Sequence, residues 1–359
     1  MRFDNPIEIK PEQLRDLSTP IVDVRSEGEY AEGHIPGSIN IALFSDAERD
    51  YIGRVYKTSP RAARFTAMEV IGPKLTKFVR RIHQLTKNKN YPVIVSCWRG
   101  GMRSKAAVDL LRMAGVDALQ LEGGYRSYRR FIKERLDSYQ LSVPVVIIKG
   151  KSGTGKTEII KHVKREGFPA LDLEALAGHR GSAFGGYAGH ASVSQKTFDS
   201  LLLAELDQAK GEKWLLMEGE SKRIGNLYIP DFLFKAMGSG YIIEAVGSIT
   251  DRVKRTLEEY IPKSAEDVAY LQGALKRIKG KLSQDKFTRL TDYLAKGEYR
   301  EFAQLLLVEY YDNIYDFQLP GREYLFSVDS TDSKKAAMEI AAALKHFFSD
   351  SGGKNPPVL

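Results

Sequence analysis

The sequence predicts an α/β protein with two domains in tandem, and three observations support this prediction. Short apolar runs with strand character alternate with amphipathic segments of helical period, which is typical of parallel sheets covered by helices. Two of these runs, Val93–Val95 and Val145–Ile148, lead directly into glycine-rich turns. A chain of 359 residues is also too long for one ordinary core. We expect a first domain over residues 1–139, a second over 140–350, and a disordered tail over 351–359.

The first domain is expected to alternate strands and helices. Its expected strands lie at residues 20–24, 38–42, 92–96 and 118–121, and its expected helices at 74–87, 103–114 and 125–139. The second domain is expected to mix both kinds of element and then to become helical. Its expected strands lie at 145–148, 214–217 and 241–246, and its expected helical stretches at 157–166, 264–316 and 333–348.

The composition indicates a soluble globular protein, with 43% hydrophobic and 28% charged residues. A single cysteine excludes an intramolecular disulfide and fits a reducing compartment. The N-terminus lacks the apolar core of a secretory signal, and no run approaches the roughly 20 apolar residues of a transmembrane helix. We therefore expect a cytoplasmic protein without membrane contact. The net charge of +8 favours an anionic partner such as nucleic acid, although a basic surface that aids solubility is the alternative.

Cys97 opens the run Cys97-Trp98-Arg99-Gly100-Gly101-Met102-Arg103-Ser104, directly after an apolar strand. The carboxyl end of such a strand is where parallel α/β sheets place their chemistry. Nearby arginines and a helix N-terminus stabilise a thiolate, so Cys97 is predicted to be a nucleophile. Arg99 and Arg103 are predicted to bind an oxyanion beside it. The alternative, an inert core cysteine, fits poorly with two glycines and two arginines in the same loop.

Four separated motifs in the first domain resemble a rhodanese domain. They are Asp23-Val24-Arg25-Ser26, Gly33-His34-Ile35-Pro36-Gly37-Ser38, the Cys97 loop, and Leu121-Glu122-Gly123-Gly124-Tyr125. The resemblance covers residues 10–135 and implies that Cys97 carries sulfur or selenium. Asp23 and Arg25 are expected to form a buried salt bridge that supports the loop.

The spacing between Cys97 and Arg103 leaves a second interpretation open. C-x5-R is also the spacing of cysteine-dependent phosphatases, and a loop of this width suits a tetrahedral phosphate-type anion. Against a phosphatase, Ser96 stands where these enzymes usually have histidine, and no obvious general acid follows. The loop could instead hold the phosphate of a phosphorylated selenium donor.

The second domain opens with a complete phosphate-binding motif. Gly150-Lys151-Ser152-Gly153-Thr154-Gly155-Lys156-Thr157 matches G-x-x-x-x-G-K-[ST] between an apolar strand and a helix. Its backbone N–H groups are predicted to cradle a diphosphate that Lys156 neutralises, and Thr157 is predicted to bind Mg²⁺. Glu218 ends a later apolar strand and is the candidate metal-binding acid, with Glu220 close by. The alternative for these acids is a structural pairing with Lys222 or Arg223.

Two further features suggest substrate contacts. The glycine-dense run at 178–190 is predicted to be a substrate loop, with His179 and Arg180 as candidate phosphate contacts. Basic residues follow Tyr125 at the domain junction, and Arg126, Arg129 and Arg130 are candidates for RNA binding. Solvated helix faces also carry such charge runs, which is the alternative.

The succession of the Cys97 loop, the phosphate-binding motif and His179-Arg180-Gly181-Ser182-Ala183-Phe184-Gly185 resembles the tRNA 2-selenouridine synthase family over nearly the whole chain. The one departure is Gly219, where an acidic residue is expected. The resemblance implies conversion of 2-thiouridine to 2-selenouridine at the tRNA wobble position through S-geranyl-2-thiouridine. It also implies geranyl diphosphate and selenophosphate as co-substrates, Mg²⁺, Cys97 as selenium carrier, and a possible selenophosphate-supplying enzyme as partner. An ATP-dependent tRNA sulfurtransferase, a phosphatase fused to a P-loop domain and an RNA-binding regulator remain alternatives.

Overall fold

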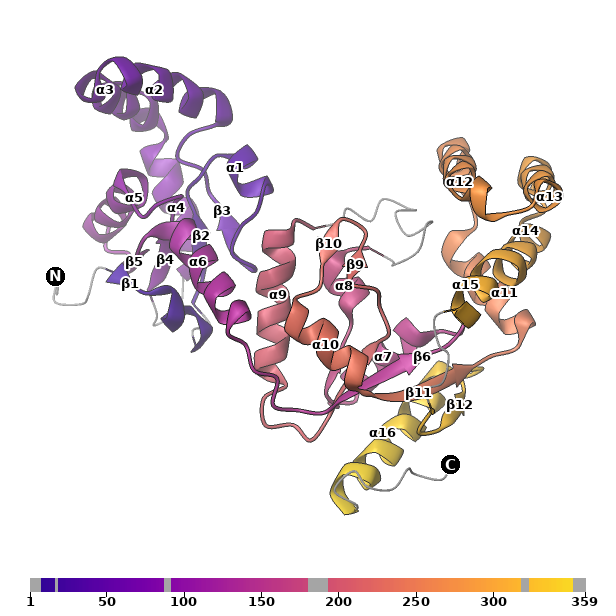
Figure 1. Cartoon of the computed structure of the whole chain (residues 1–359). Helices are drawn as coiled ribbons and strands as arrows, with labels where there is room; N and C mark the ends of the chain where they lie inside the picture. Colours follow the sequence, from indigo (N-terminus) through magenta and orange to yellow (C-terminus); the bar gives the residue numbers. More distant parts are fainter. Residues whose placement is uncertain (1–7, 17–18, 87–91, 180–192, 318–322, 351–359) are drawn as a thin grey trace. The chain divides into compact units, whose positions relative to one another are not determined.

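The chain forms two compact units in the computed structural model (Figure 1). The first comprises Met1–Ser138 with Asp199–Leu203, and the second comprises Tyr139–Phe198 with Ala204–Leu359. The structure describes residues 8–16, 19–86, 92–179, 193–317 and 323–350. The tail predicted to be disordered lies outside these ranges.

The first unit contains a five-stranded parallel sheet in the order β1-β5-β4-β2-β3. Its strands are β1 (Glu8–Ile9), β2 (Ile21–Asp23), β3 (Ile39–Asn40), β4 (Val93–Ser96) and β5 (Ala118–Leu121). Its helices are η1 (Pro11–Asp16), α1 (Glu27–Ala31), α2 (Asp46–Thr58), α3 (Pro60–Ile71), η2 (Gly72–Lys74), α4 (Leu75–Thr86), α5 (Met102–Met113) and α6 (Gly124–Asp137). β4 is central, and all four of its residues are buried. The predicted elements of this unit are confirmed, whereas β1, η1, α1, α2, α3 and η2 were not predicted.

Local capping explains why α2 and α3 form two separate helices. Ser45 accepts a hydrogen bond from the backbone N–H of Glu48, whose carboxylate accepts one from the Ser45 N–H, so α2 starts with a capping box. Ser59 then caps α3, and Pro60 occupies its first position, where a missing N–H costs nothing. The two helices therefore form a hairpin outside the sheet (Figure 1).

The second unit has its own five-stranded parallel sheet, in the order β12-β11-β6-β8-β7. Its strands are β6 (Val145–Lys149), β7 (Ala170–Leu171), β8 (Leu215–Glu218), β11 (Tyr241–Val246) and β12 (Ser327–Asp329), with β9 (Arg223–Ile224) and β10 (Leu227–Tyr228) as a separate antiparallel pair. Its sheet-associated helices are α7 (Lys156–Arg165), α8 (Leu173–Ala177), α10 (Asp231–Ser239), α11 (Ile249–Tyr260) and α16 (Ser333–Asp350). The middle of α9 (Gln195–Gln208) is grouped with the first unit and its two ends with the second. The α/β class predicted for both domains is confirmed.

A helical layer completes the second unit and has its own apolar core. It consists of α12 (Ala265–Ile278), η4 (Lys279–Lys281), α13 (Gln284–Lys296), α14 (Tyr299–Leu306), the π-helical turn η5 (Leu307–Tyr311) and α15 (Asp312–Phe317). Leu271, Leu290, Phe302 and Tyr310 belong to this core, which is distinct from the core around the sheet. Across the described ranges, every helix is too short or too polar to span a bilayer.

Candidate active sites

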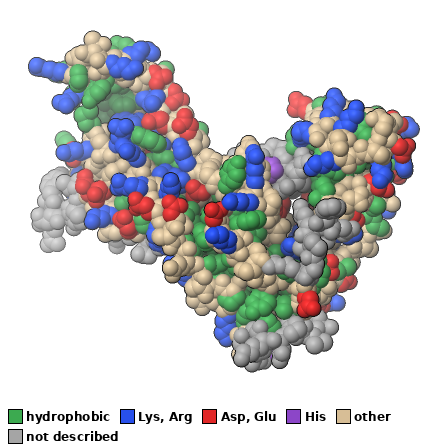
Figure 2. Space-filling view, viewed as in Figure 1, with side chains coloured by type: hydrophobic (Ala, Val, Ile, Leu, Met, Phe, Trp, Pro, Cys, Tyr) green, Lys and Arg blue, Asp and Glu red, His purple; other side chains and the backbone are tan. Residues whose placement is uncertain are grey.

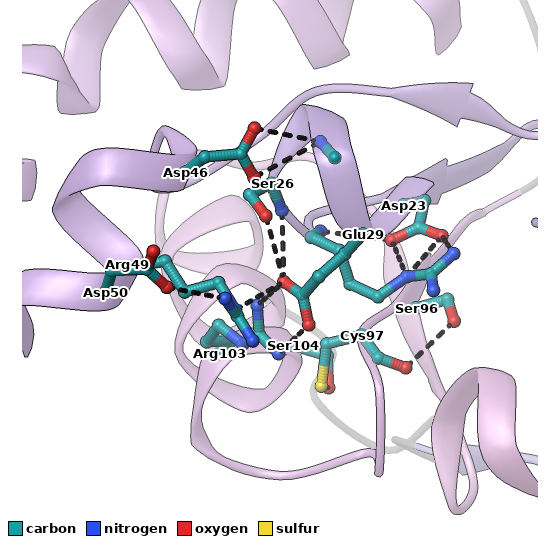
Figure 3. A network of polar contacts seen from close by, with 12 residues as sticks. Asp23, Ser26, Glu29, Asp46, Arg49, Asp50, Ser96, Cys97, Arg103 and Ser104 are labelled. Carbon is teal, nitrogen blue, oxygen red and sulfur yellow. Dashed lines mark hydrogen bonds and ion pairs between the residues drawn. The ribbon is translucent and has the colours of Figure 1, made fainter. Parts of the chain in front are cut away.

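Cys97 lies immediately after β4, at the carboxyl end of the first sheet (Figure 3). Cys97 is only 3% exposed, and its Sγ lies 3.1 Å from Oγ of Ser104 in the first turn of α5. β2 and β5 flank β4, so the sulfur sits at the middle of the sheet's carboxyl edge. This is the position where parallel α/β sheets carry their reacting groups.

The backbone of α6 and a side chain of β5 fix the shape of the Cys97 loop. The N–H groups of Tyr125 and Arg126 donate to the carbonyls of Cys97 and Trp98 at 2.8 and 2.9 Å. Gln120 donates from Nε2 to the carbonyl of Gly100 at 2.6 Å. The backbone N–H groups of Trp98 to Gly101 donate to no other described residue. The loop therefore offers donors to an anion while its carbonyls are held elsewhere.

Gly124 allows the close approach that holds this loop. It has φ of +60°, and a Cβ built there would lie 2.2 Å from the Cys97 carbonyl oxygen. We expect Gly124→Ala to lower the free energy of unfolding by at least about 1–3 kcal/mol, because it adds a clash to left-handed strain. Gly115→Ala is the matched control: it also has positive φ, +80°, but its Cβ would meet no atom within 4 Å. Urea denaturation measures the free energy of unfolding of both variants. An equal loss in Gly124→Ala and Gly115→Ala would contradict the explanation by close approach.

Arg103 is held in an ion pair that the sequence did not reveal. Its Nη1 and Nη2 donate to the two carboxylate oxygens of Glu29 at 2.6 and 3.1 Å, and Nε of Arg49 lies 3.3 Å from Glu29 Oε2 (Figure 3). Burial lowers the pKa of Arg103, but the hydrogen bond to Glu29 and the charges of Glu29 and Cys97 raise it overall. The guanidinium therefore stays charged beside the sulfur. Oxyanion binding by Arg103 remains a prediction, and the anion would have to share this guanidinium with Glu29.

Two other arginines of the site have different environments. The expected salt bridge between Asp23 and Arg25 is confirmed, since Nη2 lies 2.6 Å from Oδ2 and both side chains are 1% exposed. Arg25 also donates to the Gly33 carbonyl at 2.8 Å and stacks over the Tyr125 ring. Its Cζ also lies 6.0 Å from the centroid of the Trp98 ring, so Arg25 connects all four rhodanese-like motifs. Arg99 is exposed, so its side chain is open to solvent.

The phosphate-binding loop of the second unit joins β6, at the middle of the sheet, to α7. Gly150, Gly153 and Gly155 all have positive φ, which only glycine adopts readily. Thr154 turns inward and donates to the Lys151 carbonyl at 2.8 Å, while Ser152 accepts from Nε of Arg252 through its backbone oxygen. Lys156 donates to the Gly150 carbonyl at 2.7 Å. The loop thus has the closed shape that backbone anion binding requires.

Carboxylates gather beside Lys156 and Thr157. Thr157 donates to Oε2 of Glu174 at 3.2 Å, and Glu218 accepts from the Glu174 N–H at 2.8 Å through Oε1. Oε2 of Glu218 is buried without a hydrogen-bond partner. Burial, and next the charge of Asp172, raise the pKa of Glu218 well above its ordinary range. A buried carboxylate oxygen that lacks a donor suits a cation or a metal-bound water.

The structure also explains the glycine at 219. A Cβ there would lie 3.0 Å from Cγ2 of Ile147, so the strand end leaves little room for a side chain. Glu174, which the sequence analysis missed, takes the place beside Thr157. The described residues contain no group of three or more His, Cys, Asp or Glu side chains that could hold a metal ion by themselves. A metal here would need oxygens from its phosphate ligand or from water.

Glu220 gives this acidic site a pH dependence. Burial and the charge of Glu174 raise its pKa to about 7, whereas Lys156 lowers it. Between pH 4.5 and about 7, the Glu220 carboxyl therefore holds its proton in the folded protein but has lost it in the unfolded chain. The free energy of unfolding falls as pH rises through this window. We expect Glu220→Gln to be about 1–3 kcal/mol more stable than the parent at pH 8 and equally stable near pH 4. Denaturation in phosphate-free buffer measures the difference, and the exposed Glu212→Gln is the control; a pH-independent difference would contradict the assignment.

One cavity of about 890 Å³ joins this polar site to the helical layer. Gly155, Lys156 and Thr157 line one part, and Glu174, Glu218 and Glu220 line another. The helical layer contributes an apolar part of the wall from α12, α14, η5 and α15, with Leu257 and Tyr260 of α11: Leu271, Tyr299, Phe302, Leu306, Leu307, Tyr310, Tyr311 and Ile314. α11 also contributes the polar side chains of Arg255, Thr256, Glu258 and Glu259. A ligand of this cavity would combine a phosphate-type head with an apolar body.

The remaining candidate residues are spread over several elements. His179 lines the cavity, and its Nδ1 is buried without a partner, whereas Arg180 lies outside the described residues. Arg126 and Arg130 are exposed on α6. Arg129 is 18% exposed and pairs with Asp199 at 2.9 Å, so it is the least open of the three to an RNA strand.

Comparisons with known proteins agree for both units. Residues 143–346 match the family model described as tRNA 2-selenouridine synthase AAA domain, and residues 10–130 match the rhodanese-like domain. A tRNA 2-selenouridine synthase of Nitrosomonas europaea is 34% identical over 68% of this chain and 64% of its own length. The tRNA 2-selenouridine synthase of Alcanivorax borkumensis is 33% identical over 85% of this chain and 90% of its own length. That of Shewanella halifaxensis is 30% identical over 84% of this chain and 88% of its own length. The N-terminal domain of a putative ATP/GTP binding protein from Clostridium difficile is 38% identical, with a TM-score of 0.34 over 35% of this chain and 98% of that one.

Proposed function

The chain belongs to the tRNA 2-selenouridine synthase family, and from this premise we propose that it converts 2-thiouridine of tRNA to 2-selenouridine in two steps at two sites. The second unit alkylates the sulfur of the base with geranyl diphosphate. Cys97 of the first unit then carries the selenium that replaces the geranylthio group, with selenophosphate as donor. The tRNA is the partner that both sites share.

The observation that carries this proposal is that one continuous cavity joins Lys156 and Thr157 to apolar side chains of the helical layer. A nucleotide would present a polar base and ribose to Leu257, Leu306 and Tyr310, whereas a geranyl chain buries only hydrocarbon there. An allylic diphosphate therefore matches the phosphate-binding loop with its head and the apolar side chains of α12, α14 and η5 with its hydrocarbon chain. This favours the geranyl transfer over the alternative of an ATP-dependent sulfurtransferase.

In the first step, the sulfur of 2-thiouridine attacks C1 of the geranyl group. The new S–C bond forms as the C1–O bond breaks, pyrophosphate leaves, and N3 of the base loses a proton. Lys156 and the loop N–H groups stabilise the charge that develops on the leaving pyrophosphate. Thr157 and Glu218 are the residues proposed to hold Mg²⁺ with the diphosphate, where the ion would supply further positive charge.

In the second step, selenium bonds to C2 of the base and geranylthiol leaves, which is easier than expelling sulfur from a C=S bond. Cys97 is proposed to hold that selenium as a selenenyl sulfide. Water releases phosphate and selenide from selenophosphate, and a disulfide acts as the two-electron oxidant that joins the selenide to the Cys97 sulfur. After the selenium has bonded to C2, a thiol reduces the S–Se bond and restores the Cys97 thiol. The free N–H groups of the loop, with Arg103 close by, fit the tetrahedral phosphate of selenophosphate. Ser104, 3.1 Å from the sulfur, is placed to hydrogen-bond a thiolate or the carried selenium.

Tyr299 tests the apolar end of the cavity. It lines the cavity from α14, and we expect Tyr299→Ala to weaken geranyl diphosphate binding about tenfold, the effect of about 1.4 kcal/mol of lost apolar contact. Inorganic pyrophosphate should bind as before, because it reaches only the loop. Tyr293→Ala is the matched control, since Tyr293 packs in the same helical core without lining the cavity. Calorimetric titration measures the affinity for both ligands. If Tyr299→Ala weakened the binding of geranyl diphosphate and of pyrophosphate equally, or if the parent bound ATP more tightly than geranyl diphosphate, the proposal would be contradicted.

A further inference from the structure

The hairpin of α2 and α3 carries a surface that neither proposed step uses. Its three aromatic side chains are unusually open, with Tyr51, Tyr56 and Phe65 exposed by 50%, 50% and 58%, and Met68 by 66%. Neither helix buries an apolar stripe, and Ala63 is the only buried residue in the pair. These aromatic rings therefore contribute little to the core of the first unit.

The same surface is basic. From Gly53 to Met68 the sequence contains Arg54, Lys57, Arg61 and Arg64 and no acidic residue. All four basic side chains are exposed. Figure 2 shows Lys and Arg side chains next to hydrophobic ones over the hairpin that Figure 1 labels α2 and α3.

Helical spacing brings the two kinds of side chain onto shared faces. On α3, Arg61, Phe65 and Met68 follow i, i+4 and i+7, with Arg64 beside them. On α2, Arg49 and Tyr56 are seven residues apart, two turns along one face. Rings that alternate with cations at this spacing are the combination that binds single-stranded nucleic acid, because bases stack on the rings and phosphates pair with the cations.

Two ion pairs connect α2 to the surroundings of Cys97. Arg49 of α2 contacts Glu29, and Glu29 binds Arg103 beside the sulfur (Figure 3). A strand that lies along the Arg49 and Tyr56 face of α2 would therefore reach the carboxyl edge of the sheet where Cys97 lies. The half-exposed Arg49 sits at the start of this path.

We infer that the α2–α3 surface, defined by Arg54, Tyr56, Lys57, Arg61, Arg64, Phe65 and Met68, binds the single-stranded RNA next to the nucleotide that reaches Cys97. This inference rests on the proposed function, since it assumes an RNA substrate. It adds a binding surface on the first unit that is separate from the candidate arginines of α6.

Two double variants test the surface against a labelled RNA stem-loop that carries 2-thiouridine in its loop. Tyr56→Ala with Phe65→Ala should weaken binding at least about fivefold for each ring that stacks on a base. Arg61→Gln with Arg64→Gln should lower the slope of log affinity against log salt by about 0.7 for each lost phosphate contact. Fluorescence anisotropy over a range of salt concentrations measures both effects.

Controls separate this surface from general effects on charge and folding. Lys334→Gln with Lys345→Gln removes two exposed cations of α16, and Met113→Ala removes a side chain of α5 that is 74% exposed; both should leave RNA affinity unchanged. Alkylation of Cys97 and binding of geranyl diphosphate should also be unchanged in every variant, because none of these side chains belongs to either site.

Each outcome decides the inference. RNA affinity within twofold of the parent in both surface variants would overturn it while leaving the proposed function intact. Normal RNA affinity, with selenouridine lost only when another enzyme supplies the selenophosphate, would assign the surface to a protein partner and would also overturn it. If the parent protein itself binds no RNA, both the inference and the proposed function fail.

Discussion

Replacing Lys156 with alanine is expected to reduce geranyl transfer to 2-thiouridine tRNA at least about 100-fold, the usual cost of removing one group that stabilises transition-state charge. Lys156 lies at the start of α7 and donates to the Gly150 carbonyl, so it is poised over the loop that would receive the diphosphate. Burial lowers the pKa of Lys156, and the charges of Glu174, Glu220 and Glu218 partly offset this effect. A diphosphate would add further negative charge beside the ammonium and favour its protonated form.

Lys164→Ala is the matched control for this variant. Lys164 is on the same helix, does not line the cavity, is 44% exposed, and pairs with Glu205 at 2.5 Å rather than with the loop. It should transfer geranyl groups at close to the parent rate. S-geranyl-2-thiouridine, measured by mass spectrometry of digested tRNA, reports both variants. A geranyl transfer rate of Lys156→Ala within threefold of the parent rate would contradict a role of the phosphate-binding loop in this reaction.

Replacing Cys97 with serine is expected to abolish 2-selenouridine while S-geranyl-2-thiouridine accumulates. The hydroxyl keeps the size and the contact with Ser104 but cannot carry selenium as a selenenyl sulfide. The phosphate-binding loop is untouched, so the first step should proceed at the parent rate. Ser104→Ala is the control, since it removes the hydroxyl 3.1 Å from the sulfur and keeps the thiol; it should slow selenation without abolishing it. Normal formation of 2-selenouridine by Cys97→Ser would contradict the proposal that Cys97 carries the selenium.

The sequence predicted the two loops because their determinants are local. At each one, an apolar strand, glycines that take positive φ and the start of a helix are consecutive in the chain. Gly100 in the first loop and Gly150, Gly153 and Gly155 in the second have this conformation. Local order of this kind can be predicted from sequence even where the rest of the site cannot.

The partners that surround these loops could not be predicted in the same way. Glu29 and Arg103 are 74 positions apart, and Thr157 and Glu174 are 17 apart across a strand. Ser26 and Glu29 do match a capping box, which places Glu29 in the first turn of α1, but nothing in that pattern indicates Arg103 as its partner. Such pairs depend on how strands and helices pack.

The α2–α3 hairpin was missed for a different reason. Sequence prediction of helices relies on an apolar stripe that faces a core, and these helices bury only Ala63 between them. The helices α12–α15 fall within a stretch that was predicted as helical. Their apolar side chains were not expected to meet the phosphate-binding loop, because that wall arises only when α14 and η5 pack beside α11.

The central claim is that geranylation at the second unit precedes selenation at Cys97. Mass spectrometry of nucleosides from 2-thiouridine tRNA tests it most directly, with this protein in a thiol–disulfide buffer and either or both of geranyl diphosphate and selenophosphate. With both present, S-geranyl-2-thiouridine should rise first and then fall as 2-selenouridine appears. With geranyl diphosphate alone the intermediate should persist, and with selenophosphate alone the base should remain 2-thiouridine. Formation of 2-selenouridine at the full rate without geranyl diphosphate would contradict the account.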